Sequence, residues 1–375
     1  MEMKDGMKME NTMRKTLKQR FCLMLALLLI VFTVSAAAEE TNEAETWLRL
    51  AREAYEQEDY ETSFRYYEQA AKAGNVDGQY MTATSCYYGR GTEQSYEKAA
   101  EYMSMAAAQG DADAQMMLAI LYVNGIGVEQ SYEKALEYFS LSADQNHPVA
   151  QYNLGWMYMN GDGVEPSREK ALEYWRLSAD QNNADSMMAL AYVYLNSQNP
   201  EYNTEKATEY IQSAADLGSA AAQTYLGRMY EYGDGVEQSF EKAAELYQLA
   251  ADQGYAEAQT SLGLLYELGD GVEQSYEKAA ELYQLAADQG DALAQAYLGL
   301  LYEFGDGVDL SYEKAAEYYQ LSADQNDPDG LECLGYLYLE GLGVEQSRDR
   351  AMELYRLAAA LGSEEAQQQL AILED

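Results

Sequence analysis

A repeat of 36 residues constrains the fold of this chain more than any other feature. The segment Ser275–Glu281, which reads Ser-Tyr-Glu-Lys-Ala-Ala-Glu, recurs with variation at this interval, starting at Ser95, Ser131, Ser167, Asn203, Ser239, Ser311 and Ser347. The register extends back to Tyr60, so nine repeats run from about Thr41 to Gly362. A unit of this length buries its apolar faces only by stacking on its neighbours. The sequence therefore predicts a stack of nine units.

Each repeat is expected to contain two helices, because its apolar residues follow helical and not strand spacing. The eighth repeat shows the pattern, with Ala294, Leu298, Leu301 and Tyr302 in the first helix and Ala315, Ala316, Tyr318, Tyr319 and Ala323 in the second. Small residues allow the two helices to approach closely. Residues 363–375 are expected to form a terminal capping helix with a polar outer face. The predicted fold class is all-α.

The two ends of the second helix support this interpretation independently. The helix opens on Ser or Asn in most repeats, and the oxygen of such a side chain accepts a hydrogen bond from the free amides of the first turn. The position just after its last turn is Gly or Asn in every repeat, and these residues adopt the left-handed conformation at low cost. These positions are Gly74, Gly110, Asn146, Asn182, Gly218, Gly254, Gly290, Asn326 and Gly362.

The glycine-containing segment after the first helix resembles the Sel1-like repeat, a relative of the tetratricopeptide repeat. The run Leu-Gly-x-Leu-Tyr-x-x-Gly-x-Gly-Val occurs at Leu262–Val272 and at Leu298–Val308. It is followed by Lys-Ala-Ala and by a Tyr where the family often has Trp. The resemblance covers about residues 76–362 as eight repeats and implies a right-handed α-solenoid of helical hairpins. It also implies a scaffold that binds peptides or proteins, without chemistry of its own in most members.

Two repeats depart from the family pattern. The first, within residues 39–75, lacks the glycine loop and is closer to a plain tetratricopeptide repeat. The fifth has Ser197, Asn199 and Pro200 where the other repeats have Gly, Gly and Val. The loop of the fifth repeat is therefore expected to differ in shape.

The charge of the chain restricts its partners. Lys and Arg total 24 against 64 Asp and Glu, which gives a net charge of -40. Such a chain repels phosphate backbones and anionic lipid. The charge therefore argues against nucleic acid as a partner and favours a basic protein or peptide.

Residues 1–38 resemble a signal peptide. Four basic residues, Arg14, Lys15, Lys18 and Arg20, precede an apolar run from Phe21 to Val34 and then a run of small residues that ends at Ala38. This order is typical of export to the periplasm, the cell surface or the medium, with cleavage before Glu39. The alternative is a retained N-terminal anchor, through which alone the chain would contact a membrane. Cys22 opens the apolar run, so the segment is a poor match to a lipoprotein signal.

No disulfide is expected in the exported chain. Cys86 and Cys333 lie seven repeats apart, beyond the Cα separation that a disulfide spans.

The residues that suggest chemistry have simpler explanations. Ser131 and Lys134 fit the Ser-x-x-Lys string of penicillin-recognising enzymes, but the same string recurs in other repeats as a helix cap. His147 is the single histidine, and with Pro148 after it we expect it at a helix start near solvent. Loop acids such as Asp234 could gather calcium, but their spacing does not match a calcium loop. The sequence therefore predicts no catalytic residue, cofactor or metal.

Two positions on the first helix differ from repeat to repeat, whereas the residues around them stay the same. Such variation on a constant scaffold suggests a surface that recognises a partner. The two positions lie four residues apart, on one helix face. We predict that they line a concave, partner-binding groove at Met116, Ile120, Tyr152, Trp156, Met188, Tyr192, Arg228 and Tyr336. Met adapts to varied partners, and Trp and Tyr are common binding anchors. The alternative is that these side chains only pack one first helix against the next.

Three functions remain open at this stage. The first is an exported, non-enzymatic scaffold that binds a protein or peptide. The second is an enzyme of penicillin-hydrolysing or wall-degrading type, and the third is a binder of wall polysaccharide that uses the tyrosines.

Overall fold

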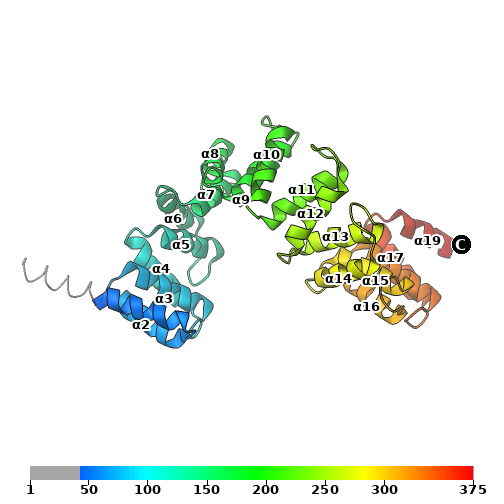
Figure 1. The fold of residues 1–375 in the computed structure, drawn as a ribbon, viewed down its shortest axis with the longest axis horizontal. Helices are drawn as coiled ribbons and strands as arrows, with labels where there is room; N and C mark the ends of the chain where they lie inside the picture. The colour runs from blue at the N-terminus through cyan, green and yellow to red at the C-terminus, as the bar shows by residue number, and fades with distance from the viewer. Residues whose placement is uncertain (1–42, 375) are drawn as a thin grey trace, which may run out of the picture. The chain divides into compact units, whose positions relative to one another are not determined.

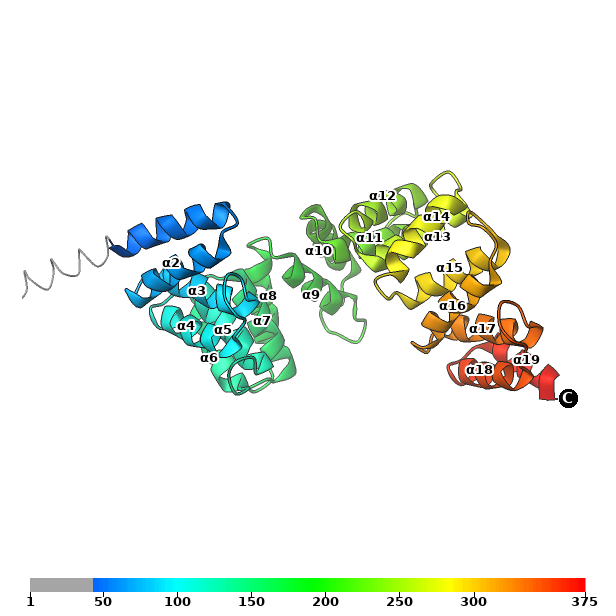
Figure 2. The ribbon, with the colours of Figure 1, turned by 90° about the horizontal axis from the view of Figure 1, so that it is seen from below.

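The computed structural model describes residues 43–374, and every regular element in this range is a helix. The expected signal peptide lies outside the described residues. The chain divides into two compact bodies, an N-terminal body up to Ser178 and a C-terminal body from Ala179 (Figure 1). In each body, consecutive helices pack as hairpins (Figure 2). The prediction of an all-α stack of hairpins is confirmed.

The N-terminal body begins with a helix over residues 43–56. The helices that follow are α2 (Tyr60–Lys72), α3 (Val76–Tyr88), α4 (Tyr96–Ala108), α5 (Ala112–Asn124), α6 (Tyr132–Ala143), α7 (Pro148–Asn160) and α8 (Arg168–Ala179). Within this body, α3, α5 and α7 are first helices of their repeats, and α2, α4, α6 and α8 are second helices.

The C-terminal body continues the same alternation. Its helices are α9 (Ala184–Leu195), α10 (Thr204–Asp216), α11 (Ala220–Tyr232), α12 (Phe240–Ala251), α13 (Ala256–Leu268), α14 (Tyr276–Ala287), α15 (Ala292–Phe304), α16 (Tyr312–Ala323), α17 (Pro328–Glu340), α18 (Arg348–Ala360) and α19 (Glu364–Glu374). The last of these is the expected terminal helix, and Ala366 is its one buried residue.

The Leu-Gly pair of the first helix makes room for a tyrosine of the second. In the eighth repeat, Tyr319 of α16 is fully buried against Gly299 of α15. A Cβ atom at Gly299 would come within 2.6 Å of the Tyr319 ring. Gly263 stands in the same relation to Tyr283 in the seventh repeat. In these repeats a glycine of the first helix therefore leaves room for a buried aromatic ring of the second helix.

The predicted helix ends are confirmed. Ser275 and Ser311 accept hydrogen bonds from the amides of Lys278 and Lys314, both at 3.2 Å. All nine Gly or Asn positions after the second helix have positive φ, between 60° at Asn326 and 105° at Gly362. These caps start and stop the second helix at the same place in each repeat.

The loop of the fifth repeat differs from the others, as expected. In the eighth repeat the first helix ends on Gly305 in the left-handed conformation, with a φ of 75°. In the fifth repeat α9 ends at Asn196 with extended backbone, φ -78° and ψ 106°. Without glycines, the chain leaves this helix by a different path.

Buried glutamines connect the hairpins. Gln259 of α13, which is 3% exposed, donates through Nε2 to the Ala251 carbonyl of the preceding repeat at 3.3 Å. Its Oε1 accepts from Gln289 Nε2 at 2.8 Å. Gln295 and Gln325 form the same pair in the next repeat. Because a buried amide must be hydrogen-bonded, these residues also fix how one hairpin sits on the next.

Candidate partner-binding surface

Four of the predicted groove residues lie in the N-terminal body. Met116 and Ile120 on α5 and Tyr152 on α7 are half-buried, whereas Trp156 on α7 is 39% exposed. The Trp156 ring meets the Trp175 ring edge-on, with centroids 5.0 Å apart. The exposed Trp156 ring is therefore held in position by the buried Trp175 ring before any partner binds.

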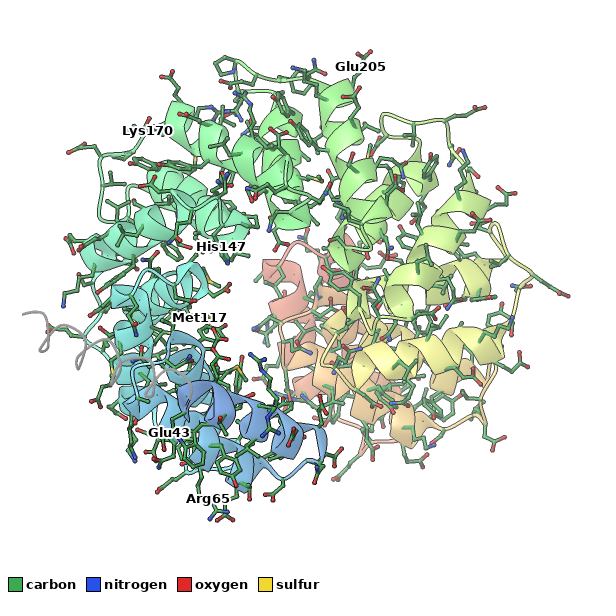
Figure 3. The ribbon with its side chains drawn as sticks, turned by 60° about the vertical axis from the view of Figure 1, so that its left-hand side comes forward. Glu43, Arg65, Met117, His147, Lys170 and Glu205 are labelled. Atoms are coloured by element: carbon green, nitrogen blue, oxygen red, sulfur yellow. The ribbon has the colours of Figure 1, made fainter. Side chains whose placement is uncertain are left out.

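The buried ring of Trp175 is itself fixed by a hydrogen bond. Its Nε1 donates to the Tyr152 carbonyl at 3.1 Å, so the second helix α8 supports the groove side of α7. In Figure 3 the labelled Met117 and His147, at first-helix positions, lie toward the inner side of the N-terminal body, and Arg65 and Lys170 of second helices lie on its outer side. The first helices thus present the inner face of this body.

The other four predicted residues lie in the C-terminal body, so the eight residues form two separate sets. Tyr192 on α9 is 54% exposed and Tyr336 on α17 is 44% exposed. Met188 is buried at 7% and offers a partner little surface. The Tyr192 and Tyr225 rings pack edge to face, with their centroids 6.0 Å apart. Partial burial raises the pKa of Tyr192.

Arg228 on α11 is exposed and held by two neighbours. Its guanidinium carbon lies 4.7 Å from the centre of the Tyr225 ring, and one of its nitrogens lies 3.7 Å from a carboxylate oxygen of Glu257. Tyr225, Arg228, Thr204, Thr208 and Asp234 line a cavity of about 390 Å³ near the altered loop of the fifth repeat. This is the one predicted groove position at which a cation faces the solvent.

The Ser-x-x-Lys string serves the fold. Ser131 Oγ accepts from the Lys134 amide at 3.3 Å, and the Lys134 ammonium lies 4.9 Å from the centre of the Tyr122 ring. The same cation–ring contact, at 4.6 to 5.5 Å, pairs Lys170 with Tyr158, Lys206 with Tyr194, Lys242 with Tyr230, Lys278 with Tyr266 and Lys314 with Tyr302. The lysine therefore holds a tyrosine of the first helix, and the serine caps the second helix.

His147 also acts as a cap. It lies at the start of α7, as expected, but only 15% of its side chain is exposed. Its Nδ1 accepts from the Ala150 amide at 3.3 Å, so the proton is on Nε2, which lies 3.0 Å from an oxygen of Asp113. Nδ1 therefore caps α7, and Nε2 connects the fourth repeat to the third.

Burial favours the neutral forms of several tyrosine and cysteine side chains. Tyr319 donates to Glu303 Oε2 at 2.7 Å, and burial, with the nearby Cys333 and Glu303, raises the pKa of Tyr319. Burial also raises the pKa of the Cys333 thiol to about 12 and raises the pKa of Cys86. Both cysteines are free. A thiol in this state is a poor nucleophile.

Neither metal ligation nor membrane crossing finds support in the described region. Within residues 43–374, no group of three or more His, Cys, Asp or Glu side chains is arranged to hold a metal ion. In the same range, no helix has both the length and the apolar character needed to cross a bilayer.

The sequence reasoning overlooked one surface feature. The second helices carry an exposed Leu or Met at one position, seen at Met105, Leu141, Leu177, Leu249, Leu285, Leu321 and Leu357. The sequence contains this signal, because these residues recur at the repeat interval and each has a Glu four residues before it. Unlike the first-helix positions predicted to bind a partner, this position is apolar in nearly every repeat.

Fold and surfaces together define an α-solenoid of helical hairpins whose first helices present variable side chains. The family model described as Sel1 repeat matches nine segments, residues 48–75, 76–111, 112–147, 148–183, 184–219, 220–255, 256–291, 292–327 and 334–363. The chain belongs to the Sel1-repeat family. Proteins of this family are commonly scaffolds for protein–protein interaction, and this chain has the scaffold fold.

Two solved structures are similar to the chain over most of its length. A protective antigen of uropathogenic Escherichia coli, which displays an SLR fold, is 31% identical, with a TM-score of 0.69, covering 83% of this chain and 67% of that one. A Sel1 repeat protein from Oxalobacter formigenes is 30% identical, with a TM-score of 0.59, covering 82% of this chain and 90% of that one. No curated protein sequence matches the chain.

Proposed function

We propose that the chain is an exported, non-enzymatic scaffold that binds a protein or peptide through the first-helix positions. The observation that carries the proposal is the exposure of Trp156, Tyr192 and Tyr336 on first helices that are anchored by buried leucines, namely Leu154, Leu190 and Leu334. Exposed aromatic side chains on a rigid support are typical binding anchors. The pattern of residues 1–38 supports export.

The charge of the chain supports a basic partner. With 64 acidic against 24 basic residues, the field around the protein attracts cationic segments and speeds their encounter. The net charge remains -40 after every lysine and arginine has been counted.

The proposal is tested by capture from matched cell-surface extracts. Residues 39–375 are immobilised, and retained proteins are compared between the wild type and a variant with Trp156→Ala, Tyr192→Ala and Tyr336→Ala. The matched control changes the exposed tyrosines Tyr132 and Tyr202 to Ala, which lie outside the first-helix positions. A partner lost only from the first variant, at unchanged helicity, supports the groove.

Two other outcomes would contradict the proposal. A partner held equally by both variants would mean that the first-helix aromatics only pack. Cosedimentation with cell-wall material that persists after protease treatment of that material, or turnover of a penicillin by the purified chain, would favour one of the two other functions.

A further inference from the structure

The second helices present a row of exposed apolar residues that the proposed first-helix groove does not use. In the C-terminal body the row consists of Leu249, Leu285, Leu321 and Leu357, which are 46% to 53% exposed. It stops at Ser213, an exposed polar residue of the fifth repeat. Single exposed leucines are ordinary, but a row kept in register over four repeats is an apolar surface that packing does not require.

Each leucine lies in a line of carboxylates on its own helix. On α14 the order is Glu277, Glu281, Leu285 and Asp288, at spacings that place all four on one face, and all four are exposed. We call this surface the second-helix stripe, and it comprises Glu241, Glu245, Leu249, Asp252, Glu277, Glu281, Leu285, Asp288, Glu313, Glu317, Leu321, Asp324, Asp349, Glu353 and Leu357.

The lysines of the same helices do not neutralise the stripe. The ammonium groups of Lys278 and Lys314 lie 4.7 and 4.6 Å from the centres of the Tyr266 and Tyr302 rings, on the first helices of their own hairpins. Glu353 pairs with Arg350 at 2.6 Å, but the stripe as a whole keeps a negative net charge that a cationic partner can meet.

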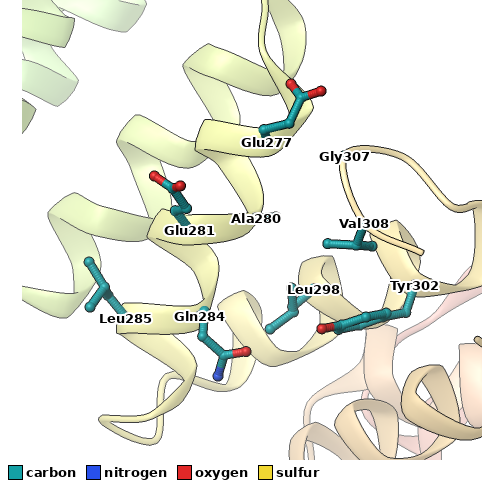
Figure 4. A pocket seen from close by; sticks show the side chains of 9 residues that line it. All are labelled: Glu277, Ala280, Glu281, Gln284, Leu285, Leu298, Tyr302, Gly307 and Val308. Carbon is teal, nitrogen blue, oxygen red and sulfur yellow. The ribbon is translucent and has the colours of Figure 1, made fainter. Parts of the chain in front are cut away.

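Neighbouring second helices contact each other beside the stripe, and a cleft next to it separates α14 from α15. The Tyr318 hydroxyl of α16 donates to Gln284 Oε1 of α14 at 2.7 Å, so these two second helices are in contact. An open cleft of about 710 Å³ lies between α14 and α15 and is lined by Glu277, Ala280, Glu281, Gln284, Leu285, Leu298, Tyr302, Gly307 and Val308 (Figure 4). Its floor is mostly apolar and its rim is acidic.

We propose that the second-helix stripe of the C-terminal body binds an extended segment of a partner protein in which apolar residues alternate with lysine or arginine. The apolar side chains would contact the leucines and the cleft, and the cationic groups would meet the carboxylates. A long basic side chain suits such a cleft, because its methylene stem packs on apolar surface while its charged end reaches the rim.

Charge excludes the other occupants. A second copy of the chain would bring one acidic stripe against another, and like charges placed together oppose association. Nucleic acid and anionic lipid are repelled for the same reason. A cationic segment is the occupant for which the charges are complementary.

The repeat also sets the spacing of the segment. Directly packed helices lie about 8–10 Å apart, and the second helices α14 and α16, which meet through the long side chains of Tyr318 and Gln284, lie at least about this far apart. Three residues of a polyproline II strand, at about 3.1 Å per residue, span this minimum distance. Every third side chain of such a strand points the same way. The segment should therefore carry an apolar residue at about every third position.

The test uses the full chain and three fluorescent peptides, with binding followed by anisotropy. The first peptide consists of four Leu-Lys-Arg triplets, the second has the same composition with its leucines together at one end, and the third has Gly for each Leu. We expect the first to bind about tenfold more tightly than either of the others. Changing Leu285→Asn and Leu321→Asn should remove this advantage.

Matched variants separate the stripe from general charge and general exposure. Leu268→Asn with Ile372→Asn removes apolar residues outside the stripe that are more exposed than Leu285 and Leu321, and should leave binding unchanged. Glu281→Gln with Glu317→Gln should weaken binding more than Asp234→Asn with Asp270→Asn, which removes the same charge from loops.

Three outcomes would overturn the proposal. Equal affinity for the first and third peptides would mean that binding depends only on the attraction between opposite net charges and not on the leucines. Full binding by the Leu285→Asn, Leu321→Asn variant at unchanged helicity would exclude the stripe. Binding lost on Tyr192→Ala with Tyr336→Ala but kept by the stripe variant would assign the peptide to the first-helix groove instead, so the two surfaces are tested separately.

Discussion

Gly299 shows how a single missing side chain positions an aromatic ring. Helix propensity alone favours alanine over glycine in a helix interior by about 0.5–1 kcal/mol. A Cβ atom at Gly299 would, however, come within 2.6 Å of the Tyr319 ring. Tyr319 is fully buried, so the surrounding side chains leave its ring no space to shift. We expect Gly299→Ala to lower the free energy of unfolding by about 1–3 kcal/mol in urea denaturation. A stabilised variant would show that the ring shifts freely.

The lysine of the second helix should stabilise the fold only where a tyrosine faces it. Lys314 lies over the Tyr302 ring, and we expect Lys314→Met to lower the free energy of unfolding by about 0.5–1 kcal/mol. The second repeat offers a natural control, because Lys98 occupies the same position and Cys86 stands where the tyrosine would be. Equal losses for Lys98→Met and Lys314→Met would contradict a contribution from the ring.

Tyr355 should make the fold sensitive to alkali. Burial raises its pKa from 10.0 to about 12, so the folded chain keeps a proton that the unfolded chain releases. The stabilisation is complete below pH 10 and is lost as the pH rises from 10 to 12. Chemical denaturation across this range should show a shallower loss of stability for Tyr355→Phe than for the wild type. Identical slopes would show that Tyr355 ionises freely in the folded state.

At the scale of the helix, the sequence was sufficient to place the start of the second helix in most repeats and its end in all nine. Ser at the start and Gly or Asn after the end act through the local backbone, which does not depend on distant contacts. The altered loop of the fifth repeat was foreseen for the same reason, since Ser197 and Asn199 replace glycines.

Burial within the groove positions was harder to foresee. Met188 and Tyr192 lie one turn apart on α9, yet the first is buried and the second is 54% exposed. The spacing of residues along a helix predicts on which face of the helix a side chain lies. It does not predict how much of that side chain the neighbouring hairpin buries. The sequence likewise did not predict which tyrosine each lysine contacts, because the two residues belong to different helices.

One whole repeat should be dispensable. Each hairpin contacts its neighbours, so removing residues 255–290 joins Gly254 to Asp291 in the same register. We expect a shorter protein with an unchanged helical signal per residue in circular dichroism and a somewhat lower melting temperature. A deletion of half this length should instead disrupt the stack and serves as the control. Loss of the helical signal in the whole-repeat deletion would contradict additive, neighbour-only packing.

At the scale of the whole molecule, the dominant quantity is the net charge of -40. Repulsion between like charges destabilises a compact chain and is screened by salt. We expect the melting temperature of the full chain to rise between about 10 mM and 150 mM sodium chloride, where the Debye length falls from about 30 to 8 Å. A melting temperature that does not respond to salt would mean that the carboxylates are already too far apart to repel.

The caps described for the second helices have an evolutionary consequence. Each hairpin carries its own start and stop signals, so a duplicated gene segment of one repeat would add a complete hairpin without any compensating substitution elsewhere. The near-identity of the sixth to eighth repeats is what recent duplication would produce. The same event would lengthen a row such as Leu249, Leu285 and Leu321 by one step, so the length of a bound segment could grow together with the gene.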